Sequence, residues 1–468
     1  MNRDTGYRLQ FRGTLQIDER DLCPIVATVE FDRHDPTSLE VQLRLIGTDN
    51  ENQAASTYLR NFPYDDLSLK NEEDRTQSVQ VLGINGYEIG GVSAIYVPDF
   101  VQIGISTDPL ASDMSFHVKA ELTPSGILVQ PKINELFYTG DTRVSPIVQG
   151  KIEVSTGVGN LEVGQRYAHF NSEQHGNAIT HSVERLSITS DISIPSAGDL
   201  SSTNELLVLE VQAICTVLSL CYRQPVQHYE IEYLCTLPTR RDPLKRIARR
   251  RLPAVNRTIK HDELINYRNL INGGLQTLLR AFQNSERAEE ISRVIDFLAS
   301  SYKLVTLESS YFLAYSALDL VSAIDDPTSL YLLSSAKWKK LEKALRQNLN
   351  MIAEEQQLIY ILDELKGKLP ELRRTSGDKR IVKACAALNV NTSDLWPNEG
   401  FEAGLKTATG MRNDLFHSAL AENRHELFRH LVRVRTLVER MLLKILDWPD
   451  DQIWVWYDQN LRFVNQRM

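Results

Sequence analysis

Apolar and polar residues alternate along most of the first two hundred residues, which is the period-two pattern of half-buried β-strands. Turn residues such as Asp35–Pro36, Asn85–Gly86 and Gly90–Gly91 separate these segments. Many short strands with glycine and proline between them predict a β-sandwich or barrel. The predicted strands are Tyr7–Gln16, Ile25–Asp32, Ser38–Ile46, Ser78–Val97, Phe100–Ser106, Ser115–Val129 and Val148–Val154.

The pattern changes near Ser201, where apolar residues begin to recur three and four positions apart. Leu206–Tyr222 predicts a buried helix, and Gln227–Leu234 predicts one more strand. From His261 onward the period is helical, and short polar loops between the helices predict an antiparallel bundle. The predicted helices are Leu264–Phe282, Ala288–Tyr302, Leu307–Ile324, Ser334–Leu365, Lys379–Leu388, Glu402–Phe416 and Asn423–Leu446.

These patterns predict an α+β protein, with a β-sandwich or barrel-like domain in residues 1–235 and an all-α domain in residues 261–468. Residues 236–260 are predicted to be a basic connector, because three prolines interrupt nine basic residues and one acid. Its arginines can contact RNA phosphates without sequence choice. Alternatively they are a solvated linker, which the lack of interleaved aromatic residues favours. The candidate RNA-binding residues are Arg246, Arg249, Arg250 and Arg251.

Composition narrows the class of protein. The chain has 468 residues, 42% of them hydrophobic and 24% charged, as expected of a globular protein with more than one domain. Its formal net charge of -9 excludes a general electrostatic attraction to nucleic acid. Any contact with RNA therefore needs a local basic surface.

Cysteine and histidine spacing predicts neither disulfides nor a metal site. The five cysteines are scattered and contain no C-x-x-C pair, which favours reduced thiols. His169, His175 and His181 recur without an acidic or cysteine partner at ligand spacing. The first residues lack the apolar core of a signal peptide, and the most apolar stretch, Leu206–Leu220, is too short to span a bilayer. We therefore expect a cytoplasmic protein with no membrane segment.

One short run combines residues that suit phosphodiester chemistry. Met411–Ser418 reads M-R-N-D-L-F-H-S and places Arg412, Asn413 and His417 on one predicted helix. Asn413 and His417 are four residues apart and share a helix face, and the long Arg412 side chain can reach the same place. Arginine holds phosphate through two parallel hydrogen bonds, and histidine moves a proton near neutral pH. RNA supplies its own nucleophile, the 2′-hydroxyl, so this chemistry requires no metal.

Spacing alone is a weak signal, because the last predicted helix contains a comparable pair. Arg424 and His430 are six residues apart, and we assign them to the polar face of that helix. By the same logic, Arg412 and His417 can be an ordinary solvated helix face. Their context along the chain has to decide between the two interpretations.

The order Arg-Asn, three residues and His at the close of one helix, followed by a polar loop and a long amphipathic helix, resembles the HEPN superfamily. Tyr311–Ile324 (Y-F-L-A-Y-S-A-L-D-L-V-S-A-I) resembles the first bundle helix of that family, where an acidic residue, here Asp319, often faces the site. Arg380–Val390 and Leu395–Pro397 are similar to ApeA-type HEPN proteins, which join a β-rich N-terminal domain to a HEPN domain. The resemblance covers motifs in about residues 305–447, and only the architecture of the N-terminal half.

The resemblance implies a metal-independent endoribonuclease that needs no cofactor and acts as a homodimer in antiphage defence. Arg412 would hold phosphate, His417 would be the acid and base, and Asn413 and Asp319 would complete the site. RNA is the implied substrate, and the β domain would sense a trigger such as a phage-derived protein. Asp319 is equally expected to be a helix-face carboxylate paired with a surface lysine or arginine.

A second hypothesis is a binding module, in which the helical domain only grips RNA or a nucleotide, or only dimerises, and the β domain recognises a protein. The intact Arg412–Asn413–His417 set favours the enzyme, since a scaffold does not require it. The family often has glycine after the histidine, whereas this chain has Ser418–Ala419. That departure keeps the binding module open.

Overall fold

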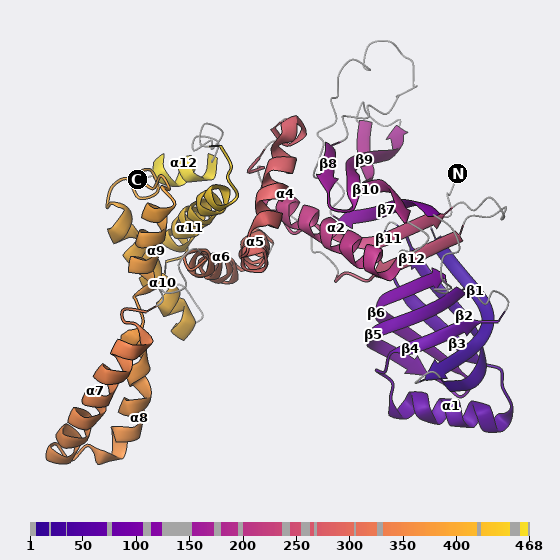
Figure 1. Cartoon of the computed structure of the whole chain (residues 1–468), viewed down its shortest axis with the longest axis horizontal. Coiled ribbons are helices and arrows are strands. Elements are labelled where there is room, and N and C mark those ends of the chain that lie inside the picture. The colour runs from indigo at the N-terminus through magenta and orange to yellow at the C-terminus, as the bar shows by residue number, and fades with distance from the viewer. Residues whose placement is uncertain are drawn as a thin grey trace, which may run out of the picture. The chain divides into compact units, whose positions relative to one another are not determined.

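The computed structural model forms two compact units (Figure 1). One contains residues up to Arg257 together with Glu263–Leu279, and the other consists mainly of Arg280–Met468. The structure describes residues 6–17, 20–33, 35–72, 77–105, 114–123, 152–172, 179–194, 200–235, 244–253, 263–265, 269–303, 306–324, 331–418, 423–449 and 459–466.

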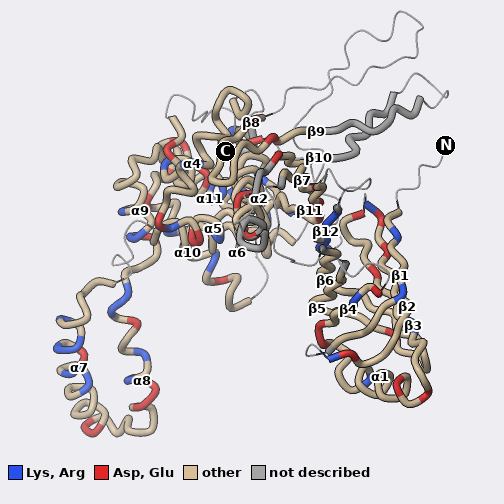
Figure 2. Tube along the Cα trace, turned by 45° about the vertical axis from the view of Figure 1, so that its right-hand side comes forward, with Lys and Arg blue, Asp and Glu red and all other residues tan. Residues whose placement is uncertain are grey.

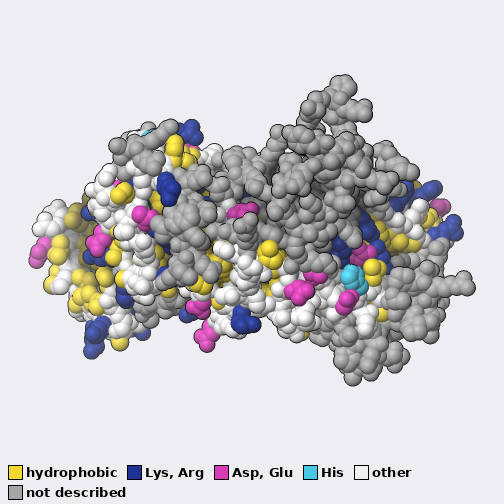
Figure 3. Space-filling view, turned by 90° about the horizontal axis from the view of Figure 1, so that it is seen from above, with side chains coloured by type: hydrophobic (Ala, Val, Ile, Leu, Met, Phe, Trp, Pro, Cys, Tyr) yellow, Lys and Arg dark blue, Asp and Glu magenta, His cyan; other side chains and the backbone are white. Residues whose placement is uncertain are grey.

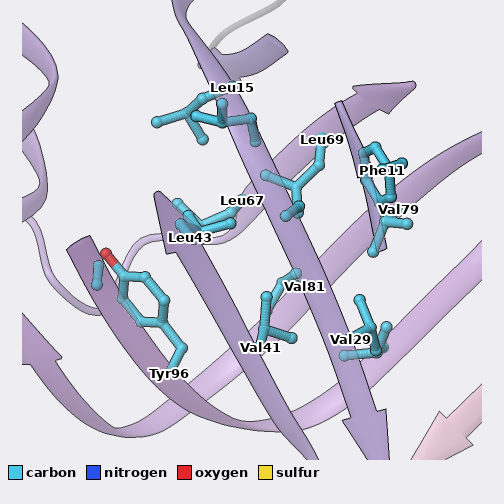
Figure 4. Close-up of a cluster of buried hydrophobic side chains, with 14 of the residues drawn as sticks. Phe11, Leu15, Val29, Val41, Leu43, Leu67, Leu69, Val79, Val81 and Tyr96 are labelled. Carbon is cyan, nitrogen blue, oxygen red and sulfur yellow. The ribbon is translucent and has the colours of Figure 1, made fainter. Parts of the chain in front are cut away.

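Six antiparallel strands close into a barrel at the start of the first unit. They pair in the order β3-β2-β1-β4-β5-β6, and β3 pairs with β6 to complete the ring. Successive side chains of a strand point to opposite faces, so alternate apolar residues such as Val41 and Leu43 fill the interior (Figure 4). The predicted sandwich or barrel is therefore a barrel. Its strands are β1 (Gly6–Ile17), β2 (Arg20–Asp32), β3 (Glu40–Leu45), β4 (Leu67–Asn71), β5 (Gln77–Ile89) and β6 (Ser93–Ile105).

Glycines serve two different purposes in this barrel. A Cβ at Gly13 would lie 2.0 Å from the carbonyl oxygen of Lys70, so only glycine lets β1 approach β4 so closely. Asn85–Gly86, predicted as a turn, instead lies at an irregularity inside β5, between Ile84 and Gly86. Helix α1 (Asp49–Asn61), which we did not predict, follows β3 and begins with a capping box between Thr48 and Glu51.

Six further strands extend the sheet beyond the barrel through the pairing of β6 with β12. Helix α2 (Leu200–Tyr222) packs against β10 and β11. It is longer than the apolar stretch seen in the sequence, and its window Glu205–Tyr222 has the length and apolarity of a membrane span. However, 56% of that window is buried inside the fold, which is equally typical of a core helix. In sheet order the strands are β12 (Leu244–Arg250), β11 (Gln227–Cys235), β7 (Met114–Thr123), β10 (Ile179–Ile194), β9 (Gly159–Ser172) and β8 (Ile152–Thr156).

Strand β12 corrects the prediction of a basic connector, because Leu244–Arg250 is a paired strand between β6 and β11. The first unit also extends past the predicted boundary at residue 261. The backbone amides of Leu264 and Ile265 donate to the carbonyl oxygen of Cys221 at 2.8 and 3.3 Å. Gln276 exchanges hydrogen bonds with the backbone of Ser155 in β8. These contacts hold the start of the helical sequence to the β unit.

The second unit is helical, as the period of its sequence predicts. Helix α6 packs against α5, α9, α10 and α11, so it lies at the centre of the unit (Figure 1). Helix α11 buries the long apolar stripe that includes Leu431, Val438 and Met441. Entering from the π-helical turn η1 (Leu270–Gly274), the chain forms α4 (Leu275–Asn284), α5 (Ala288–Ser301), α6 (Leu307–Val321), α7 (Ser335–Glu355), α8 (Leu362–Lys368), α9 (Gly377–Ala387), α10 (Phe401–Ser418), α11 (Arg424–Ile445) and α12 (Gln459–Gln466).

The single helix predicted for Ser334–Leu365 is two helices. Helix α7 ends at Glu355, and Gln357 has a φ of 56°, in the left-handed region that closes helices. Short 3-10 turns at Ile359–Ile361 and Leu369–Arg373 then flank α8. Helices α7 and α8 pack against each other as a hairpin, whose ends meet at the bridge between Tyr331 and Arg374.

Candidate active site

Two tyrosines of α6 fix the position of α10. The Tyr311 hydroxyl donates to the carbonyl oxygen of Ala408 at 2.7 Å, and the Tyr315 hydroxyl lies 2.8 Å from Thr409 Oγ1. Burial raises the pKa of Tyr315 to about 12, so its hydroxyl keeps its proton well into the alkaline range. One helical turn further along α6 lies Asp319, and Arg412 follows Thr409 by three residues on α10. The tyrosines thus bring the neighbourhoods of Asp319 and Arg412 together.

Asp319 is held by an arginine that we did not predict as a site residue. Arg380, on α9, donates to Asp319 Oδ1 at 2.8 Å and to Ser322 Oγ at 3.0 Å. The side chain of Asp319 is 36% exposed and that of Arg380 is 11% exposed. Burial raises the pKa of Asp319, while the guanidinium groups of Arg380 and Arg412 oppose the rise. Asp319 is therefore paired with an arginine, as one interpretation expected, although Arg380 is mostly buried rather than at the surface, and Asp319 also lies within electrostatic reach of Arg412.

The three residues of the sequence motif lie at the end of α10, where the motif placed them. Half-buried Arg412 donates to Asn413 Oδ1 at 3.2 Å. Asn413 and His417 are exposed. No hydrogen bond or ion pair joins His417 to Arg412, Asn413 or Asp319, all of which the structure describes. One chain thus groups Arg412 with Asp319 and leaves the imidazole of His417 open to solvent.

The four arginines predicted to bind RNA do not form one surface. Strand geometry sends their side chains to alternate faces of the sheet. Arg249 is fully buried against Glu230, and Arg246 is buried as well. Arg250 is exposed, and Arg251 is half-buried with a guanidinium nitrogen 3.8 Å from Asp99 Oδ1. Because Arg246 and Arg249 are buried, they cannot reach a phosphate backbone, and the prediction of a shared basic surface is wrong.

A different basic surface lies on α7, in the helical unit. Its first half exposes four lysines, with Glu342 as the one acid, and Glu342 is paired with Arg346. Figure 2 shows the basic positions along α7 in blue. Elsewhere, on the described part of the face in Figure 3, basic and acidic side chains are interspersed. The sequence run K-W-K-K-L-E-K contained this signal, which we did not single out. The lysines are Lys337, Lys339, Lys340 and Lys343.

The second arginine–histidine pair, Arg424 and His430 of α11, has one residue at the surface and one in the core. Arg424 is exposed and lies 3.6 Å from Glu308 Oε1. His430 is only 2% exposed and accepts a hydrogen bond from Trp396 Nε1 at Nδ1, over 3.3 Å. Its assignment to the polar face of the helix is therefore wrong. A substitution of His430 is expected to affect stability through lost packing, rather than being silent.

His430 is expected to make the stability of the helical unit dependent on pH. Burial lowers the pKa of His430 to about 4, helped by Arg433 and Arg429 and opposed by Glu426. Because the folded-state pKa lies below the ordinary value of about 6.5, protonation favours the unfolded state. The free energy of unfolding should be constant above about pH 6.5 and fall by about 3 kcal/mol toward pH 4. His430→Gln, which cannot titrate, should lose most of this slope.

Tryptophan fluorescence during urea titration measures this effect in the right unit, because all five tryptophans lie at residue 338 or beyond. His425→Gln, at an exposed position of the same helix, is the matched control. An unchanged slope in the His430 variant would show that another group governs the acid response.

Within the described residues, no group of three or more His, Cys, Asp or Glu side chains lies together as possible metal ligands. All five cysteines are free and buried. The side chains of His169, His175 and His181 fall outside the described part of the chain, as does Ala419. Comparison of the chain with protein-family models, curated proteins and solved structures finds no match.

Proposed function

We propose that this protein is a metal-independent endoribonuclease of the HEPN type. The observation that carries the proposal is the meeting of α6, α9 and α10, which brings a half-buried Asp319 within electrostatic reach of Arg412, on the helix that also carries the exposed His417. An arginine near a carboxylate is preorganised, and a solvent-facing imidazole is free to exchange protons. The HEPN resemblance of the sequence around Arg412 and His417 supports the proposal as well.

The proposed reaction is attack of the 2′-hydroxyl on the adjacent phosphorus. His417 takes the proton of that hydroxyl or gives a proton to the departing 5′-oxygen. Arg412 stabilises the charge that develops on the phosphoryl oxygens. Asp319, held by Arg380, attracts the Arg412 guanidinium electrostatically, and Asn413 limits the movement of that guanidinium through the hydrogen bond between their side chains.

A second copy of the chain completes this mechanism. One His417 cannot easily be both base and acid in a single step, whereas two motifs across a two-fold axis supply two imidazoles. We therefore expect an even oligomer, most simply a homodimer, in light scattering at micromolar concentration. A monomer that still cleaves RNA would contradict the paired-site mechanism.

The products distinguish this chemistry from hydrolysis by a metal-bound water. Cleavage should leave a 2′,3′-cyclic phosphate, or the monophosphate formed when it opens, and a 5′-hydroxyl. It should persist in EDTA, because the RNA hydroxyl is the nucleophile and needs no metal to generate it. Mass spectrometry of a short cleaved RNA tests both points. Loss of activity in chelator, restored by Mg²⁺ or Mn²⁺, would contradict the proposal.

The alternative is a binding module, and a specific observation favours it. In one chain His417 makes no hydrogen bond or ion pair with the other three site residues, and the exposed lysines of α7 suit the binding of phosphates without any chemistry. Expression in bacterial cells separates the two functions. If the protein is a toxic effector, as expected of a defence protein, the wild type should arrest growth and the His417→Ala variant should not. A binding module should behave alike in both forms.

A further inference from the structure

Phe416 is an exposed aromatic residue inside the candidate site. Its side chain is 65% exposed, and it is the one large apolar residue of α10 that faces solvent so fully. Leu415 before it is buried in the helical core, and His417 after it is exposed. A single exposed apolar residue is common on protein surfaces, so its exposure alone indicates nothing. What it lies between is informative.

The ring lies between the two groups that carry the proposed chemistry. The Arg412 guanidinium carbon is 5.7 Å from the ring centroid, one helical turn away on the same face. The His417 imidazole lies 5.9 Å away with its plane nearly perpendicular to the ring, at 89°, and with an exposed fraction of 65% the residue still presents much of its surface to solvent. A nucleotide whose phosphate contacts Arg412 therefore carries its base to the neighbourhood of this ring.

We propose that Phe416 is a stacking platform for the nucleobase next to the phosphate held by Arg412, a base that must be unpaired to reach the ring. This inference rests on the proposed function. Every base has a π-face, so an aromatic platform accepts any sequence, but only an unpaired base can leave its stack to reach it. In a regular RNA duplex the bases are stacked on each other, which excludes such a contact. The surrounding residues Asn413, Asp414 and His417 are polar and exposed, which suits a nucleotide better than an apolar protein partner.

The platform can be tested by binding, without requiring cleavage. The probe is a set of single-stranded 2′-O-methyl oligonucleotides, which lack the nucleophile, with 2-aminopurine at each position in turn. The full-length protein should quench the fluorescence at one position. Phe416→Leu, which keeps an apolar side chain but not the ring, should lose the quench and bind roughly tenfold to a hundredfold more weakly. Phe416→Tyr should retain both, and a duplex of the same sequence should show no quench.

Phe297→Leu is the matched control, because Phe297 is an exposed phenylalanine on α5 of the same unit. An unchanged quench in Phe416→Leu would overturn the platform. The platform would also be overturned if Phe416→Leu changed the oligomeric mass of the protein while the remaining oligomer kept the quench. The ring would then be a contact between subunits. A Phe416-dependent quench without cleavage of unmodified RNA by wild type would support the platform and overturn the ribonuclease. Cleavage by the wild type with no quench at any position would support the ribonuclease and overturn the platform.

Discussion

Replacing His417 with alanine is expected to lower cleavage of RNA by about 10²–10⁴-fold, which is the usual contribution of a positioned acid or base. The protein should stay folded, because the imidazole is exposed and packs against no core residue. The free energy of unfolding should change by no more than about 0.5 kcal/mol. Single-turnover cleavage of a labelled RNA, with circular dichroism to confirm folding, measures both.

His425→Ala is the control for this experiment, since His425 is an exposed histidine of the same unit and lies outside the motif. Arg412→Lys should also lose most of its cleavage activity, because lysine keeps the charge but lacks the planar fork that holds two phosphoryl oxygens. Arg424→Ala, which removes an exposed charge on α11, should cleave normally. If the His417 and Arg412 variants retain activity while the His425 or Arg424 variant loses it, the site is misassigned.

Arg249→Met is expected to destabilise the β unit by about 3–5 kcal/mol, because it leaves the buried carboxylate of Glu230 without its partner. The Arg249 guanidinium donates to Glu230 Oε2 at 3.1 Å and to the carbonyl oxygens of Asp32 and Asp35. It also lies between the rings of Phe31 and Tyr229, at 4.8 and 4.7 Å. One residue thereby links the barrel to β11.

The variant should also respond to pH in a defined direction. Burial already raises the pKa of Glu230, and Arg249 opposes that rise. Without Arg249 the folded-state pKa rises further, so the loss of stability is smallest in acid and grows as pH rises through that pKa. Hydrogen exchange in β11 and β12 at pH 5 and pH 8 measures the difference. Arg250→Met, one residue along at an exposed position, should change stability by no more than about 0.5 kcal/mol. Equal effects of the two substitutions would contradict the role of the buried pair.

Much of the secondary structure could be predicted because its signals are local. Helices α5, α6, α9, α10 and α11 begin and end within a few residues of the predicted bounds, since each carries its own apolar stripe. The capping box of α1 was equally readable in Thr48–Asp49–Asn50–Glu51, and we overlooked it. The break after α7 was not readable, because Gln357 adopts a left-handed conformation that sequence assigns to glycine or asparagine.

The strand β12 shows where local signals mislead. Its sequence, L-K-R-I-A-R-R, is basic and lies between prolines, which are the signals of an exposed connector. Burial of Arg249 becomes possible only because Glu230 and the carbonyl oxygens of another strand's end surround it. The sequence likewise did not decide whether the strands close into a barrel, because alternating apolar residues predict an inward face in a sandwich and in a barrel alike. The pairing of β3 with β6 decides between them.

For the candidate site, the sequence by itself determined that Arg412, Asn413 and His417 share the end of one helix, because helical spacing is a local property. Only the tertiary structure decided that Arg380 of α9 holds Asp319 of α6, and that Arg412 lies close enough to Asp319 to affect its pKa. It also decided that His430 is buried and His417 is exposed, although both lie on amphipathic helices. These relations depend on which helix faces meet, and packing between residues distant in the chain sets them.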